Sequence, residues 1–263
     1  MDNSSVFVKS DVYPIEVLFL EKYDVDFYQR EYVWGKKQIE DMVEDLTIEF
    51  LKNWKDGHAL PKVKEYSPYY MGEIVLSEKG GSRSAIIDGQ QRITTVTLLL
   101  IYLKRKFGSV KGFPAIIDNL IASDYYGEQL FNLDIDYRRP CMEALYKNGA
   151  YTVKKNDPVS VQNLVDRYMD IDECWRDEIC DHNIVPFMYW LKEKVMFSKV
   201  WTNSNEFAYV IFETMNDRGL SLTQVEMLRS FLLANIDESK REAIMKEFDA
   251  MTKRLAAKFI IQV

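Results

Sequence analysis

The sequence predicts an α+β fold, in which a small sheet near the N-terminus precedes a mostly helical region. Two observations lead to this prediction. Two extended apolar runs flank a glycine-containing turn at residues 79–82, which is typical of a β-hairpin. A helical pattern of apolar residues follows the hairpin directly, and residues 115–200 are rich in helical patterns and low in strand signals.

The elements are predicted in order along the chain. The first fifth predicts a short helix, then an extended segment at residues 25–28 and a turn. From Gly35 onward the spacing predicts a helix with one buried stripe, formed by Ile39, Met42, Val43, Leu46 and Phe50. The hairpin comes next, and the helix after it is expected to pack on the sheet through Ile93, Val96, Leu100, Leu103 and Phe107.

Turn residues and charges at positions 108–114 predict a boundary. We therefore expect a sheet-containing core at residues 1–110, a helical region at 111–200 and a further helical segment at 201–263. That segment opens with a helix capped by Gly219, whose core stripe is Phe207, Val210, Ile211 and Thr214. The chain stops in the apolar stretch "KRLAAKFIIQV", so we expect an N-terminal piece of a longer protein.

The composition narrows the class of protein. The chain has 263 residues, of which 47% are hydrophobic, enough for a sizeable core. Its net charge of −7 restricts nucleic-acid contact to a local patch, such as residues 104–106 with Lys111. The longest strongly apolar run, near residues 98–103, is far shorter than the roughly 20 residues of a membrane span. Three cysteines and a start unlike a signal peptide predict a cytoplasmic protein.

The first candidate site is "IIDGQQRITT", where an apolar strand ends and a helix begins. Asp88 and Gln91 match a capping box, in which two side chains bond the free N–H groups at a helix start. The same geometry can bind a phosphate, because a helix N-terminus presents N–H donors and a partial positive charge. That alternative uses Gly89, Arg92, Thr94 and Thr95. The two alternatives compete, since a capping carboxylate occupies donors that a phosphate needs.

The second candidate is "YQREYVWGKKQ", which contains Gln29, Arg30, Trp34 and Gln38. An arginine beside aromatic side chains can stack on a nucleotide base. Its aliphatic stem can equally well cover the hydrophobic core, and the residues alone favour neither alternative.

The third candidate is "FETMNDRGLSL", in which one helix face carries Glu213, Asn216 and Asp217 beside Arg218. Carboxylate and amide oxygens suit Mg²⁺, and the arginine suits a phosphate. The alternative is a charged helix end that Gly219 caps.

Several other chemistries are excluded by the residues that they require. His58 and His182 are the only histidines, which makes a histidine-based nuclease or zinc centre hard to build. Cys174, Cys180 and His182 lack the spacing and the fourth ligand of a structural zinc site. The sequence contains neither a Gly-x-Ser-x-Gly elbow nor a Gly-x-Gly-x-x-Gly fingerprint.

The three motifs occur in one order along the chain. Together with "MGEIVL" before "DGQQR", and with Tyr137 and Arg138, they closely resemble the N-terminal domain family of GmrSD-type modification-dependent restriction systems, also called domain of unknown function family 262. The resemblance implies a ParB/sulfiredoxin-like mixed-sheet core in which the hairpin and the next helix bind the phosphates of an NTP. It also implies Mg²⁺ as a cofactor and NTP binding or hydrolysis that regulates cleavage of foreign DNA.

Carried over residue by residue, the resemblance places a phosphate pocket at Asp88, Gly89, Gln90, Gln91 and Arg92, with Thr94 and Thr95 one turn further on. It adds Gln29, Arg30 and Trp34 to that pocket and closes it with Glu213, Asn216 and Arg218. Glu213 and Asn216 are then the candidate Mg²⁺ ligands. For hydrolysis, Arg92 would neutralise charge, and the attacking water would be oriented by Gln90, Gln91 or Glu213.

The implied partners are DNA and a nuclease domain, C-terminal or on another chain, and a homo-oligomer stays open. This chain has no His-Asn-His motif and is not expected to cut DNA itself. One alternative is a DNA-binding reader module without nucleotide turnover, whose affinity would fall steeply with salt. Another is a scaffold in which Asp88 and Gln91 only cap a helix.

Overall fold

The computed structural model describes residues 7–25, 31–78, 84–115, 117–125 and 128–204, and beyond them residues 207, 210, 211, 240, 243, 244, 246–248, 250 and 251. Contacts between Cα atoms divide the chain into two units: Met1–Asp26 with Glu31–Phe212, and Phe27–Arg30 with Glu213–Val263. The described residues of the second unit are helical. The sheet and the helices named below belong to the first unit.

The first unit is built on a five-stranded mixed sheet with the order β1-β7-β3-β4-β2. The strands are β1 Val8–Pro14, β2 Tyr23–Val25, β3 Tyr69–Glu78, β4 Ser84–Asp88 and β7 Val195–Thr202. β7 pairs antiparallel with β1 and parallel with β3, while β4 pairs antiparallel with β3 and parallel with β2. The α+β class and the predicted β3–β4 hairpin are confirmed.

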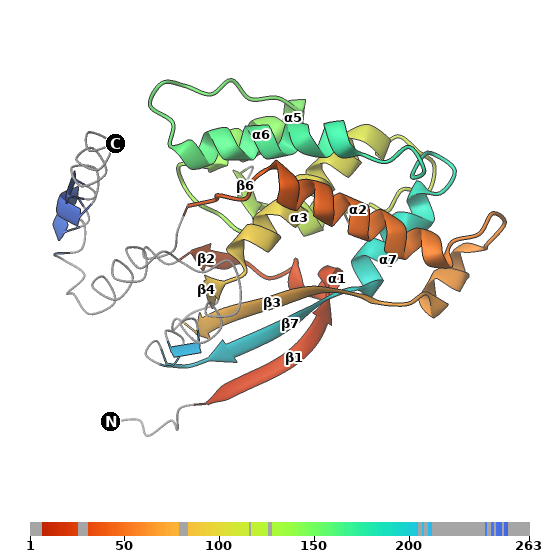
Figure 1. Ribbon diagram of the computed structural model, residues 1–263, viewed down its shortest axis with the longest axis horizontal. Coiled ribbons are helices and arrows are strands. Elements are labelled where there is room, and N and C mark those ends of the chain that lie inside the picture. The colour runs from red at the N-terminus through yellow and green to blue at the C-terminus, as the bar shows by residue number, and fades with distance from the viewer. Residues whose placement is uncertain are drawn as a thin grey trace, which may run out of the picture. The chain divides into compact units, whose positions relative to one another are not determined.

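Helices gather on one side of this sheet, where Figure 1 shows α2, α3 and α6 stacked together. The remaining elements are α1 Ile15–Leu18, α2 Lys36–Asn53, the 3₁₀ helix η1 Leu60–Glu65, α3 Gln90–Phe107, α4 Ile117–Ile121, the small hairpin β5 Ala122–Tyr125 and β6 Glu128–Phe131, α5 Arg139–Asn148, α6 Val159–Cys174 and α7 Ile184–Lys194. None of the helices in the described ranges is long and apolar enough to span a bilayer.

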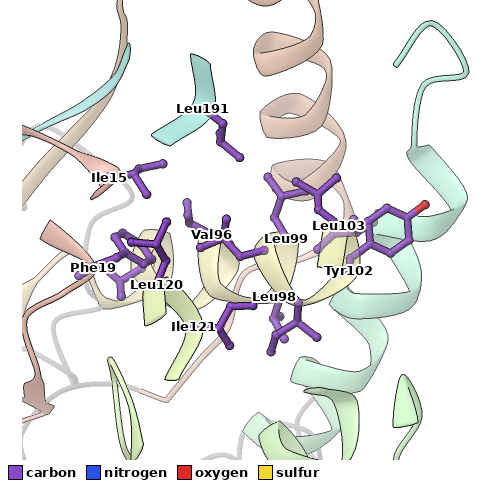
Figure 2. Packing of buried hydrophobic residues seen from close by; sticks show 14 of the residues in the cluster. Ile15, Phe19, Val96, Leu98, Leu99, Tyr102, Leu103, Leu120, Ile121 and Leu191 are labelled. Carbon is purple, nitrogen blue, oxygen red and sulfur yellow. The ribbon is translucent and has the colours of Figure 1, made fainter. Parts of the chain in front are cut away.

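Helix α3 lies at the centre of the core. Its predicted apolar stripe is buried, and so are residues on its other faces, including Leu98, Leu99 and Ile101. Figure 2 shows why: side chains of α3 meet Phe19 on one side and Ile121 on another. A helix with apolar residues on every face is stable only when other elements surround it, and α3 has such neighbours. The predicted stripe of α2 is buried as well.

Four strands of the described structure were not predicted from the sequence. Strand β1 has mostly exposed side chains because it lies at the sheet edge, so it lacks an apolar run. Strand β7 follows α7 directly at Val195, with no glycine or proline to separate the two elements. The β5–β6 hairpin also lies within the range that we expected to be helical. Strand β7 pairs with both β1 and β3. Residues 108–114, where we predicted a boundary, lie within the first unit.

Candidate functional site

The connection between β4 and α3 turns on a single glycine. Gly89 is the residue before the first turn of α3 and has a φ of 96°, in the left-handed region. A Cβ atom at this position would lie 2.6 Å from the Ile74 Cγ2 atom and 3.0 Å from the Glu73 carbonyl oxygen. Both the backbone angle and the close approach to β3 therefore require glycine here. We call this turn the Gly89 elbow.

The capping-box prediction for Asp88 and Gln91 was wrong. The residue that caps α3 is Gly89, so the third helical position is Arg92 and not Gln91. No side chain of the described residues caps this helix start. The Asp88 carboxylate forms no hydrogen bond or ion pair to any part of the chain that the structure describes. Among the described residues, no carboxylate therefore takes the donors at the start of α3.

Gln91 instead fastens the segment that leads into α2. Its Oε1 atom accepts hydrogen bonds from the backbone N–H of Val33 at 2.9 Å and of Trp34 at 3.2 Å. Its Nε2 atom donates to the Glu31 carbonyl oxygen at 2.9 Å. The side chain is only 6% exposed. We call residues 31–34, which follow Gln29 and Arg30 in the chain, the clamped segment.

Further contacts hold the clamped segment in place. The hydroxyl of Tyr32 lies 2.8 Å from Thr95 Oγ1, and Thr95 Oγ1 also donates to the Gln91 carbonyl oxygen. Asn163 donates to the Tyr32 carbonyl oxygen at 2.7 Å, and Arg167 to that of Trp34 at 3.0 Å. Burial raises the pKa of Tyr32, so its hydroxyl stays protonated. The hydroxyl of Thr95 is therefore part of an internal network.

The side chain of Arg92 lies against β3 at Gly72 and Glu73. Its Nη1 atom donates to the Glu73 carbonyl oxygen at 3.0 Å. A Cβ atom on Gly72 would lie 2.9 Å from Arg92 Nε, so the missing side chain at Gly72 leaves room for the guanidinium group. Within the described ranges Arg92 has no carboxylate partner, and it is half-buried. No carboxylate of the described residues therefore neutralises the charge of its guanidinium group.

The other predicted site residues have different surroundings. Trp34 is half-buried and packs against the core. Gln90 and Thr94 are buried, and the Thr94 hydroxyl has no hydrogen-bond partner in the part of the chain described. Other predicted site residues lie outside the described residues: Gln29, Arg30, Glu213, Asn216, Asp217 and Arg218.

One cluster was not assigned a role from the sequence. The Glu31 carboxylate accepts hydrogen bonds from the Tyr137 hydroxyl at 2.8 Å and from Arg138 Nη2 at 3.0 Å. Arg138 is 4% exposed. Burial raises the pKa of Glu31, but the hydrogen bonds and the charge of Arg138 outweigh it, so the pKa is lowered overall. The adjacent Tyr137 and Arg138 were the only sequence signal for this contact.

Replacing Glu31 with glutamine should remove a pH-dependent part of the stability. Because the pKa of Glu31 is lowered by folding, its carboxylate stabilises the native state above a pH of about 4.3, and this contribution is lost as the pH falls through the folded-state pKa. The expected loss at neutral pH is below about 1 kcal/mol, since the carboxylate is half-exposed. Urea unfolding of both proteins at several pH values would measure it. A difference that does not change with pH would contradict this account.

The residues that the structure describes contain no group of three or more histidine, cysteine, aspartate or glutamate side chains that could hold a metal ion. Comparison with known families shows that residues 15–233 match the model of the GmrSD restriction endonuclease, N-terminal domain. A search of curated proteins found no match.

Proposed function

The chain belongs to the family of GmrSD restriction endonuclease N-terminal domains, and from this membership we propose that it binds a nucleoside triphosphate with Mg²⁺ and regulates DNA cleavage by a nuclease domain. The nuclease domain would be C-terminal or on a partner chain. One observation carries the proposal: the Gly89 elbow leaves the start of α3 without a capping side chain from the described residues, and Arg92 stands in its first turn.

The elbow has the features that a phosphate group requires. A helix N-terminus attracts negative charge through its N–H donors and its dipole. Gly89 permits the left-handed turn that brings the start of α3 close to β3, and Arg92 offers a planar set of charged donors. No carboxylate within the described part of the chain competes for these donors, as Asp88 would have done in a capping box. These features of the helix start support triphosphate binding at Gly89, Gln90 and Arg92.

Gln91 and Thr95 receive a different role in the proposal. Their side chains are bonded to the clamped segment or to the helix itself, so we assign them to positioning and not to phosphate contact. The segment that they position follows Gln29 and Arg30, which we propose to reach the same ligand. Water would then be oriented by Gln90 or Glu213, since both polar atoms of the Gln91 amide are already bonded.

The remaining ligand contacts are proposed from family membership. Glu213, Asn216 and Arg218 would close the site, and the first two would supply oxygen ligands to Mg²⁺. When bound, Mg²⁺ neutralises the charge of the phosphate oxygens. Arg92 would hold the same oxygens from the side of the helix. Slow hydrolysis of the NTP is part of the proposal, and phosphate release would measure it.

Thermal unfolding with each of the four NTPs and Mg²⁺ tests the proposal. A ligand at about 100 times its dissociation constant should stabilise the native protein by roughly 2.7 kcal/mol, which raises the melting temperature by about 5–10 °C. Arg92→Ala should fold normally and show no rise. Arg176→Ala removes an exposed arginine that pairs with Glu44 and Glu178, and it should respond like the unmodified protein.

Three other results would change the proposal. A well-folded protein whose melting temperature responds to no NTP would overturn nucleotide binding. Binding of duplex DNA that weakens steeply with salt and ignores NTP would then favour the DNA-binding reader module instead. An equal response in the unmodified protein and in Arg92→Ala would show that a nucleotide binds elsewhere in the chain.

A further inference from the structure

A second site candidate is a pocket of about 390 Å³ at the far end of α3. Its walls come from the last turns of α3, the end of α5 and the second half of α6. Tyr102, in one wall, follows Gln90 by twelve residues, a separation of about 18 Å along a helix. The pocket is therefore distinct from the Gly89 elbow. Its volume lies within the range of about 300–1,000 Å³ that is usual for small-molecule sites.

Arg105 is fixed at one wall of the pocket. Its Nη1 atom donates to the Lys147 carbonyl oxygen at 2.6 Å and lies 3.4 Å from that of Tyr146, at the end of α5. Gly149, which ends α5 with a φ of 74°, makes room for it, because a Cβ atom there would lie 2.6 Å from Arg105 Nε. A guanidinium group has five N–H donors, so these contacts leave donors for a ligand.

Lys106 brings a second positive charge to the pocket. Its Nζ atom donates to the Tyr102 hydroxyl at 2.7 Å. Burial and the nearby Asp172 carboxylate raise the pKa of Tyr102, so this hydroxyl stays neutral. Neither Arg105 nor Lys106 forms an ion pair with a carboxylate among the described residues, whereas the adjacent Lys104 pairs with Asp118. The lining carries these two cations and one carboxylate, Asp172, so its charge is +1 in a chain of net charge −7, which favours an anionic ligand.

The other walls suit a planar aromatic group. Met169 is 49% exposed and offers a polarisable apolar surface. It shares the lining with Tyr102 and Tyr168, whose ring centroids lie 6.2 Å apart. Asn148 and Asp172 complete the lining. Their amide and carboxylate groups can donate to and accept from the edge of a heterocyclic base.

We propose that this pocket binds a nucleoside monophosphate unit. The phosphate lies between Arg105 and Lys106, and the base packs on Met169 with its edge against Asn148 and Asp172. The unit is either a free nucleotide or the 5′-phosphorylated end of a single-stranded nucleic acid, because both present the same chemistry. This site does not depend on the proposed triphosphate site at the Gly89 elbow.

Calorimetric titration of the full chain tests the pocket with two probes: the four free nucleoside monophosphates, and a short 5′-phosphorylated single-stranded oligonucleotide. Lys106→Met should weaken binding by about tenfold or more, since a hydrogen bond to a charged group contributes about 1.5–3 kcal/mol. Lys111→Met makes the same change in charge at an exposed lysine outside the pocket, and it should bind like the unmodified protein. Asn148→Asp places a negative charge in the lining and should weaken binding as well.

The outcomes separate the two sites. Binding that is lost in Lys106→Met and kept in Arg92→Ala supports the pocket, even if NTP binding at the elbow fails. Binding of the monophosphates identifies a free nucleotide as the ligand, and binding of the oligonucleotide alone identifies a nucleic-acid end. The proposal is overturned if neither probe binds, if Lys106→Met binds as well as the unmodified protein, or if Lys111→Met loses as much affinity.

Discussion

Replacing Gly89 with alanine should lower the free energy of unfolding by about 3 kcal/mol. The left-handed backbone costs an alanine about 1–2 kcal/mol, and crowding in a packed region costs about 1–3 kcal/mol more. The crowding is specific, because the new Cβ atom would meet the Ile74 Cγ2 atom at 2.6 Å. For a domain of this size the melting temperature should fall by about 6–12 °C. Calorimetry or thermal circular dichroism would measure the change.

Gly57 provides a matched control for this substitution. Its φ is 84°, also in the left-handed region, but a Cβ atom there would have no neighbour within 4 Å. Gly57→Ala should therefore lose only the backbone contribution, about 1–2 kcal/mol. The difference in unfolding free energy between the two variants measures the cost of crowding between the Gly89 elbow and β3. Equal losses in both variants would mean that β3 moves away without resistance.

Replacing Gln91 with leucine should lower the free energy of unfolding by about 2–4 kcal/mol. The change removes all three hydrogen bonds to the clamped segment and leaves the N–H groups of Val33 and Trp34 without an acceptor. Each buried group that loses its partner costs about 1–3 kcal/mol, and partial exposure of this segment keeps the total near the lower end. Because the clamped segment follows Gln29 and Arg30, the response of the melting temperature to NTP should also be lost.

Gln38→Leu is the corresponding control for Gln91. Gln38 Oε1 accepts one hydrogen bond, from the Gly35 N–H at 2.9 Å, so its loss should cost about 1 kcal/mol and leave nucleotide binding intact. Urea unfolding of both variants beside the unmodified protein makes the comparison. If Gln91→Leu is no less stable than Gln38→Leu, the clamped segment is held by its other contacts, chiefly Asn163 and Arg167.

The elements with strong local patterns could be predicted from the sequence. Helices α2 and α3 show apolar residues at helical spacing, and the β3–β4 hairpin is marked by a glycine-rich turn. Strand β7 was not predicted, because its place in the sheet depends on pairing with β1 and β3 and not on a local signal. An edge strand such as β1, with exposed side chains on both faces, has no apolar periodicity to find.

In the candidate site too, the features with a local sequence pattern were predicted and the long-range contacts were not. The strand, the glycine turn and the helix start at residues 88–92 were predicted, but the capping residue was placed one position too early. That error arose because an aspartate followed by glutamine at the third position satisfies the capping-box pattern in sequence alone. The partners of Gln91 lie about sixty residues earlier in the chain, and no local pattern indicates such a contact. The ParB/sulfiredoxin-like relationship stays a prediction.

The pairing of β7 has a consequence for how this chain folds during synthesis. Val8 of β1 lies opposite Thr202 of β7, so the contact order of this sheet is high and its last strand emerges late from the ribosome. A nascent chain of the first 110 residues already contains β3, β4 and α3, but one edge of β3 still lacks its neighbour. An open apolar strand edge invites pairing with other chains. Fragments that stop before residue 202 should therefore aggregate.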